Sequence, residues 1–124
     1  MKDLTRAEEQ VMQILWELKK GFVKDISERF DDPKPAYTTI STIIRILETK
    51  GFIGHKAYGK THEYYPLVNK EEYTKAFMGS VVKNYFSNSY QKMVSFFAKD
   101  NEISLKEMEE IMKVLQEEIK KKSN

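Results

Sequence analysis

The sequence predicts a mainly α-helical protein with one small β-hairpin, and three observations support that prediction. Apolar residues recur at helical spacing through most of the 124 residues. Residues 53–67 instead form two short strand-like runs joined around a glycine. The helix expected just before them has one apolar face and one face of small hydroxyl side chains. Helices followed by such a hairpin are typical of a winged helix-turn-helix.

The overall composition is that of a soluble globular protein, with 40% hydrophobic and 32% charged residues. There is no cysteine, which excludes disulfides and cysteine-ligated zinc or copper. No apolar run is long enough to cross a membrane, and the first residues do not form a secretory signal. We therefore expect a cytoplasmic protein.

Two helices are expected ahead of the polar-faced helix. The first should begin after Thr5, because Thr5 and Glu8 have the spacing of a capping box. Its expected buried stripe consists of Val11, Met12, Leu15, Trp16 and Leu18. The second is expected over residues 22–30, because two prolines in residues 31–35 prevent a helix from continuing. The short linker predicts a helix-turn-helix pair with the helix that follows.

The third helix carries the candidate functional face. Its apolar stripe consists of Ile40, Ile43, Ile44 and Leu47. Its other side holds Thr38, Thr39, Ser41, Thr42 and Arg45. Threonine and serine disfavour helices, so solubility alone does not explain this face. Short hydroxyl side chains let a helix lie deep in a DNA major groove and reach phosphates and base edges, and the arginine can contact guanine.

The hairpin follows the third helix, with strands expected over residues 53–58 and 62–67. Gly59 is the expected residue type in the loop between them. From the third helix to the second strand, four basic residues stand against one acidic residue. This local excess of positive charge is compatible with phosphate contact.

Three more helices are expected after the hairpin. Asn69 caps the first, Ser87-Asn88-Ser89 separates it from the second, and Ser104 with Glu107 opens the third. Together they carry more apolar surface than the segment can cover alone, which favours a partner, and a second copy of the chain is the common choice. The alternative is that they pack on the N-terminal domain of the same chain.

We therefore divide the chain into a winged helix-turn-helix domain over residues 1–68 and a helical dimerisation domain over residues 69–124. The residues expected at the dimer interface are Tyr73, Phe77, Val81, Tyr85, Met93, Phe97, Met108, Ile111, Met112 and Leu115.

Other chemistry finds little support. His55 and His62 face each other across the hairpin, but two histidines without a third ligand are weak evidence for metal, and polar hairpin residues are the favoured interpretation. A cysteine nucleophile, a Gly-rich phosphate loop and a His-Glu-x-x-His motif are all absent from the sequence. We expect no enzyme, metal or cofactor.

The chain resembles the penicillinase-repressor family of bacterial transcriptional regulators, the BlaI/MecI/CopY type. The resemblance covers the first two thirds closely and the helical tail in outline. The matching stretches include Leu4-Thr5-Arg6-Ala7-Glu8, Ala36-Tyr37-Thr38-Thr39-Ile40, Tyr58-Gly59-Lys60 and Tyr64-Tyr65-Pro66-Leu67.

This resemblance implies a homodimer that represses transcription by binding a pseudo-palindromic double-stranded DNA operator. It implies that the polar face of the third helix enters the major groove and that Lys56 and Lys60 approach the backbone. With Tyr37, the expected DNA-binding set is Tyr37, Thr38, Thr39, Ser41, Thr42, Arg45, Lys56 and Lys60.

Two departures from the family pattern concern the inducing signal. Family members cut by a sensor protease have an Asn-Phe bond in the C-terminal region, whereas here Phe96 replaces the asparagine before Phe97. Proteolytic relief of repression at this bond is therefore in question. The copper-responsive branch carries a cysteine cluster that this chain lacks.

A second function from another class remains open, namely a winged-helix module that serves protein–protein assembly and binds no specific DNA. Salt-sensitive, sequence-specific DNA binding would distinguish the repressor from such a module.

Overall fold

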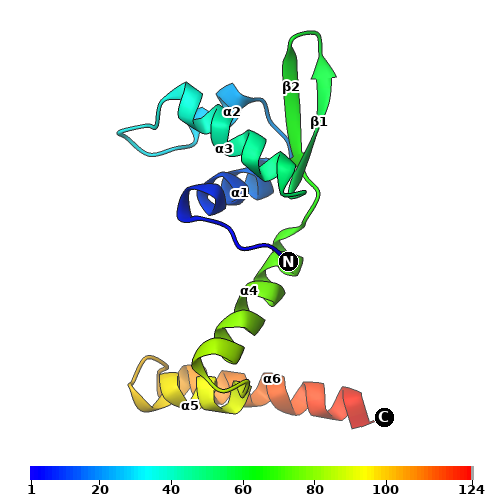
Figure 1. Ribbon diagram of the computed structural model, residues 1–124. Helices are drawn as coiled ribbons and strands as arrows, with labels where there is room; N and C mark the ends of the chain where they lie inside the picture. Colours follow the sequence, from blue (N-terminus) through cyan, green and yellow to red (C-terminus); the bar gives the residue numbers. More distant parts are fainter. Residues whose placement is uncertain (124) are drawn as a thin grey trace. The chain divides into compact units, whose positions relative to one another are not determined.

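The computed structural model describes residues 1–123, which form six helices and one two-stranded antiparallel hairpin (Figure 1). The elements are α1 (Arg6–Leu18), α2 (Val23–Glu28), α3 (Tyr37–Thr49), β1 (Ile53–Tyr58), β2 (Thr61–Pro66), α4 (Lys70–Tyr85), α5 (Tyr90–Lys99) and α6 (Leu105–Ser123). The predicted fold class is confirmed. The chain divides into two compact units, Met1–Phe77 and Met78 onward. In the described residues, no helix is both long and apolar enough to span a membrane.

Helix α1 begins with the predicted capping box. The Glu8 N–H donates to Thr5 Oγ1 at 3.2 Å, and the Thr5 N–H donates to Glu8 Oε1 at 2.8 Å. These bonds satisfy two backbone N–H groups that would otherwise lack an acceptor within the helix.

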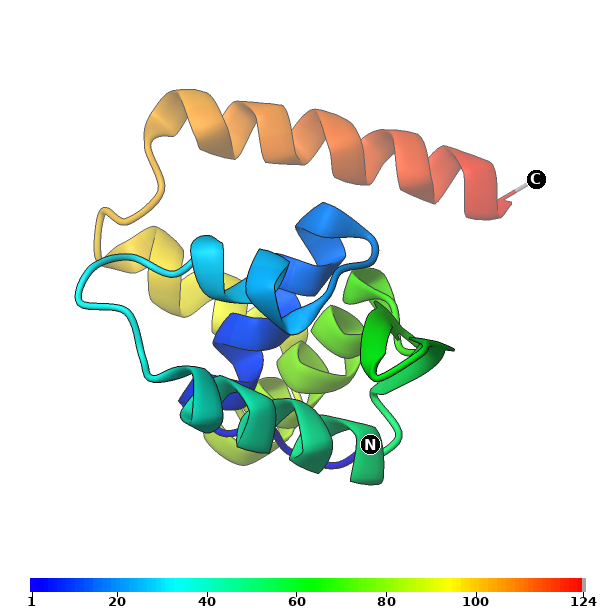
Figure 2. The same ribbon diagram turned by 90° about the horizontal axis from the view of Figure 1, so that it is seen from above.

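Helix α2 is shorter than the predicted span of 22–30. It begins at Val23, because the Asp25 carboxylate accepts a 2.9 Å hydrogen bond from the Phe22 N–H and fixes the first turn there. It ends at Glu28, and an extended loop then leads to α3, visible as the cyan segment in Figure 2.

Helix α3 buries Ile40, Ile44 and Leu47 completely, while Ile43 from the predicted stripe is only half-buried. The helix ends as expected before Gly51, whose φ of +83° is a conformation that side chains with a Cβ rarely adopt.

The hairpin turns over two residues, so β2 begins one residue earlier than predicted. Tyr58 pairs with Thr61, and Gly59 in the loop has a φ of +63°. Alternation along β2 places Tyr64 in the core and leaves Tyr65 exposed, which confirms the expectation that the two tyrosines separate. Backbone bonds between Gly21 and Tyr64 attach the α1–α2 connection to β2.

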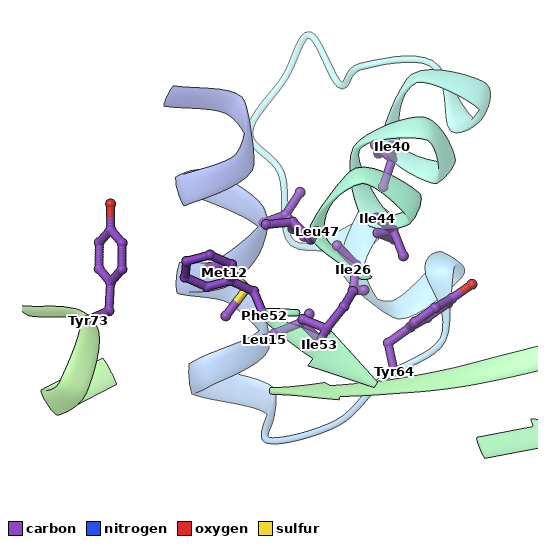
Figure 3. Close-up of a cluster of buried hydrophobic side chains, with 11 residues drawn as sticks. Met12, Leu15, Ile26, Ile40, Ile44, Leu47, Phe52, Ile53, Tyr64 and Tyr73 are labelled. Carbon is purple, nitrogen blue, oxygen red and sulfur yellow. The ribbon is translucent and has the colours of Figure 1, made fainter. Parts of the chain in front are cut away.

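The core of the first unit lies between α1, α2, α3 and the hairpin (Figure 3). It contains Val11, Met12, Leu15, Ile26, Ile40, Ile44, Leu47, Phe52, Ile53, Tyr64 and Tyr73. The expectation for Tyr73 needs correction, because this α4 residue is only 8% exposed within its own chain. Its ring centroid lies 5.8 Å from that of Trp16 and 6.0 Å from that of Phe52. Tyr73 therefore packs mainly in the core of its own unit and leaves little surface for a dimer contact.

An ion pair joins the start of α1 to the end of α3. Lys50 Nζ lies 2.7 Å from Glu8 Oε1 and also donates to the Asp3 carbonyl oxygen at 3.1 Å. Burial raises the pKa of Glu8, but hydrogen bonds from Lys50 and Thr5 and the Lys50 charge outweigh it and hold the pKa below its ordinary value of 4.5. This pair helps to fix α3 against α1.

The second unit contains the end of α4 together with α5 and α6. Ser104 accepts from the Glu107 N–H and caps α6 as expected, and Ser89, in the predicted break, accepts from the Lys92 N–H and caps α5. Among the described residues from 78 to 123, only Val82 is buried. Most of the apolar side chains of this unit are therefore at least partly exposed.

Candidate nucleic-acid interface

The polar face of α3 lies on the surface of the first unit. Thr38, Thr39, Thr42 and Arg45 are exposed, Ser41 is half-buried, and Tyr37 is 60% exposed. The apolar stripe of the same helix faces the core. The helix therefore presents its hydroxyl groups and its arginine outward, which is the arrangement that major-groove contact requires.

Hydrogen bonds within α3 limit what one of these hydroxyl groups can do. Thr42 Oγ1 donates to the Thr38 carbonyl oxygen at 2.9 Å. A threonine hydroxyl has one proton, so Thr42 can still accept a bond or offer its methyl group. Toward a base edge, this suits a cytosine or adenine amino group or a thymine methyl.

The outer surface of α3 also carries an apolar residue that the sequence analysis did not single out. Ile46 is 41% exposed and follows Thr42 by four residues, so the two side chains are neighbours along the helix. The sequence could have shown this exposure, because Ile46 lies outside the apolar stripe of residues 40, 43, 44 and 47 that faces the core.

Side chains of α3 and the hairpin meet at a small polar joint. The Glu48 carboxylate pairs with Nδ1 of His55, and the His55 and His62 rings stack with centroids 4.1 Å apart. Burial, followed by the charge of Glu48, raises the pKa of the neighbouring Tyr64 hydroxyl. The joint ties the hairpin to α3. Within the residues described, no three His, Cys, Asp or Glu side chains gather to hold a metal ion.

The two predicted hairpin lysines lie in different surroundings. Lys60 is in the two-residue loop and lines the same groove as Tyr37 and Ser41. Lys56 lies on the opposite face of the hairpin from its neighbour His55, with Nζ 5.3 Å from the Tyr58 ring centroid. The structure thus brings Lys60, but not Lys56, to the start of α3.

The groove has a volume of about 500 Å³. Its walls come from α2, the first turns of α3 and the hairpin, and they consist of Phe22, Val23, Lys24, Asp25, Tyr37, Ser41, Lys60, Thr61, His62 and Tyr64. Sequence reasoning missed Lys24 and Thr61 here. Nothing local marks Lys24, because its place in the groove depends on how α2 packs beside the hairpin.

The residues predicted for dimerisation, Tyr73 apart, are all at least partly exposed in the single chain. Phe77, Tyr85, Phe97, Met112 and Leu115 are exposed, and Val81, Met93, Met108 and Ile111 are half-buried. Their role stays a prediction.

Comparison with known proteins gives consistent matches. A family model described as penicillinase repressor matches residues 4–117. The methicillin resistance regulatory protein MecI of Staphylococcus aureus is 28% identical over 114 residues, covering 91% of this chain and 93% of that protein. The penicillinase repressor of Bacillus licheniformis is 24% identical over 119 residues, covering 92% and 90%. These are names of regulators and not of enzymes, in agreement with the sequence-based expectation.

The fold has a solved counterpart. The solution structure of the DNA-binding domain of the repressor BlaI aligns with a TM-score of 0.51 and 23% sequence identity. The alignment covers 59% of this chain and 94% of that domain. This likeness confirms the winged-helix architecture.

Proposed function

The chain belongs to the penicillinase repressor family, and we propose that it is a dimeric repressor that binds a two-fold DNA operator. The observation that carries the proposal is the outer face of α3. This face exposes Arg45 and several threonine hydroxyls, and its first turns lie beside Lys60. Threonine weakens a helix, and these side chains add nothing to the core. Binding in a DNA major groove would explain why α3 carries these hydroxyl side chains and Arg45.

The second unit supports the dimer. Its helices leave the large apolar side chains of Tyr85, Phe97, Met112 and Leu115 exposed, and such side chains are typical of a protein–protein contact when they lie together. A two-fold dimer would cover it and would present two α3 helices to two half-sites. We expect such a repressor to act in the cytoplasm, where bacterial DNA lies.

A binding titration tests the proposal directly. Duplexes tiled across the DNA upstream of the gene would be titrated at two salt concentrations, with a scrambled duplex as the control. We expect one tile to bind far more tightly than the scramble, at two protomers per duplex, and to weaken steeply with salt. Absence of binding at either salt concentration would favour the assembly module instead.

Arg45→Ala tests the role of α3 on the bound tile. Because Arg45 is exposed, we expect the variant to fold normally and to lose ~1–3 kcal/mol of binding free energy at one base position. Specificity at that position should relax. Unchanged affinity and base preference would show that α3 does not read the DNA.

Relief of repression by a sensor protease stays a prediction from the family resemblance. The bond between Phe96 and Phe97 lies within helix α5, and the two residues are 46% and 43% exposed in the single chain. Incubation of the repressor with the purified protease, followed by mass spectrometry, would show whether this bond is cut.

A further inference from the structure

We propose that Trp16 and Tyr73 are positioning residues, which fix the direction in which α4 leaves the first unit and thereby restrict the half-site spacing that a dimer can bind. This inference rests on the proposed function, because it needs a dimer on a two-fold operator. It gives the first turn of α4 a role in DNA specificity, although this turn belongs neither to the polar face of α3 nor to the hairpin.

The segment that leads into α4 is attached to the first unit by hydrogen bonds. The Phe52 carbonyl oxygen accepts from the N–H groups of Leu67 and Val68, at 2.8 Å and 3.3 Å. The Trp16 indole N–H donates to the Val68 carbonyl oxygen at 2.9 Å. Asn69 then caps α4 with its side chain. The few residues between β2 and α4 are therefore held in place.

Tyr73 attaches the first turn of α4 itself, at the edge of the core (Figure 3). Its ring packs against Trp16 and Phe52, with centroid distances of 5.8 Å and 6.0 Å, and its hydroxyl donates to Glu9 Oε2 at 3.4 Å. Burial, followed by the charge of Glu9, raises the pKa of this hydroxyl, which favours the protonated donor form. Tyr73 thus holds α4 at a second point beyond its cap, and two fixed points define the direction of a helix.

Beyond Tyr73, the hydrogen bonds of the helix carry this direction onward. The side chains of residues 74–77 are all exposed, and the next buried side chain of α4 is that of Val82 in the second unit. α4 runs as one helix over Lys70–Tyr85. A helical connection is stiffer than an irregular linker, so a dimer formed through the second unit would hold its two α3 helices at a restricted separation.

The spacing of the two half-sites is the quantity that such a restriction affects. One extra base pair moves a half-site by about 3.4 Å along the DNA and turns it by about 35° around the DNA axis. A dimer with firmly attached α4 helices follows this change only with strain, whereas a dimer with loosened α4 helices follows it freely. Attachment through Trp16 and Tyr73 therefore predicts that affinity depends steeply on half-site spacing.

The first test uses full-length variants on the operator found by the tiled titration, and on duplexes with one base pair added or removed between the half-sites. We expect the wild-type protein to lose about tenfold in affinity when the spacing changes by one base pair. Tyr73→Ala should bind the natural spacing more weakly, and its loss on the changed spacing should be only about twofold. Tyr73→Phe keeps the ring and should retain most of the wild-type spacing preference.

Two controls separate positioning from a simple loss of stability. Val11 is a fully buried core residue of α1 that is not among the groups holding α4, so Val11→Ala should keep the wild-type spacing preference. On a duplex with a single half-site, Tyr73→Ala should bind as tightly as the wild-type protein. Sedimentation should show that Tyr73→Ala still dimerises.

A second variant loosens α4 without touching the core, and it decides the question if Tyr73→Ala does not fold. Lys75 and Ala76 are both exposed, and glycine at both positions weakens the helix between Tyr73 and the second unit. The double variant Lys75→Gly, Ala76→Gly should lose the spacing preference as Tyr73→Ala does. Lys75→Ala keeps the helix and should retain that preference.

The outcomes separate this inference from the proposed function. If folded, dimeric Tyr73→Ala keeps the wild-type spacing preference, or if the wild-type protein has none, α4 does not set the spacing and the repressor proposal stands. If Val11→Ala loses the preference as fully as Tyr73→Ala, core stability and not the direction of α4 is responsible. If the wild-type protein binds no tile, the proposed function itself fails.

Discussion

The two compact units of this chain treat their apolar residues in opposite ways. The first collects eleven residues from its helices and hairpin into one core. In the second, Val82 is the only buried residue among those described, and α5 and α6 bury none. The first unit is thus a fold that one chain completes, whereas the second resembles half of a core that a second copy would complete.

Helices α1 and α6 have similar local sequence patterns but differ in how far their apolar residues are buried. Both have an apolar stripe at helical spacing and a hydroxyl residue at the start. Yet Leu15 of α1 is fully buried, while Leu115 of α6 is 54% exposed. An amphipathic pattern predicts that a face will be covered, but not whether the same chain covers it.

Truncation after Phe77 should produce the largest effect on this comparison. The first unit keeps its whole core, so we expect a folded monomer by circular dichroism and analytical ultracentrifugation. A monomer binds one half-site at a time and loses the gain from two linked contacts, so operator affinity should fall about 100-fold or more. A truncated protein that still dimerises would refute the assignment of the second unit.

The point of truncation matters. Ending the chain after Leu67 would also remove Tyr73 and the Val68 carbonyl oxygen that accepts the 2.9 Å hydrogen bond of Trp16. This shorter variant should have a lower free energy of unfolding than the one ending at Phe77. Equal stabilities in urea would show that the start of α4 does not support the first unit.

A pair of alanine substitutions should separate the two kinds of apolar surface. Ile44→Ala leaves a cavity in the core of the first unit and should lower the free energy of unfolding by ~2–5 kcal/mol. Leu115→Ala should weaken dimerisation in sedimentation experiments without unfolding the first unit. A dimer unaffected by Leu115→Ala would place the interface elsewhere.

Sequence patterns predicted the parts of this fold that depend on neighbouring residues. The caps at Thr5 and Ser104 and the separation of Tyr64 from Tyr65 each follow from a few adjacent positions. The outward hydroxyl face of α3 follows from its apolar stripe in the same way. Such features need no knowledge of how distant elements pack.

Contacts between distant segments were not predictable in this way. Tyr73 continues the same four-residue spacing as Phe77, but it packs on Trp16, which lies far earlier in the chain. Periodicity gave both residues the same expected role, although only one of them lies in the first core. Lys24 was missed for the same reason, because its neighbours in the groove come from α3 and the hairpin.

The smallest predicted effect compares an ion pair in each unit. Glu8 pairs with Lys50 in the interior, with the Glu8 side chain 5% exposed, whereas Glu118 and Lys121 pair in solvent on α6. Glu8→Gln keeps an oxygen for the Thr5 N–H but removes the charge, and should lower the free energy of unfolding at pH 7 by ~1–3 kcal/mol. Glu118→Gln should change it negligibly.

Folding lowers the pKa of Glu8, so its charge stabilises the fold above the ordinary pKa of 4.5, and this contribution is lost as the pH falls further. The difference between wild type and Glu8→Gln in urea unfolding should therefore shrink below that pH; a difference that stays constant would mean that helix capping, and not charge, is what Glu8 contributes.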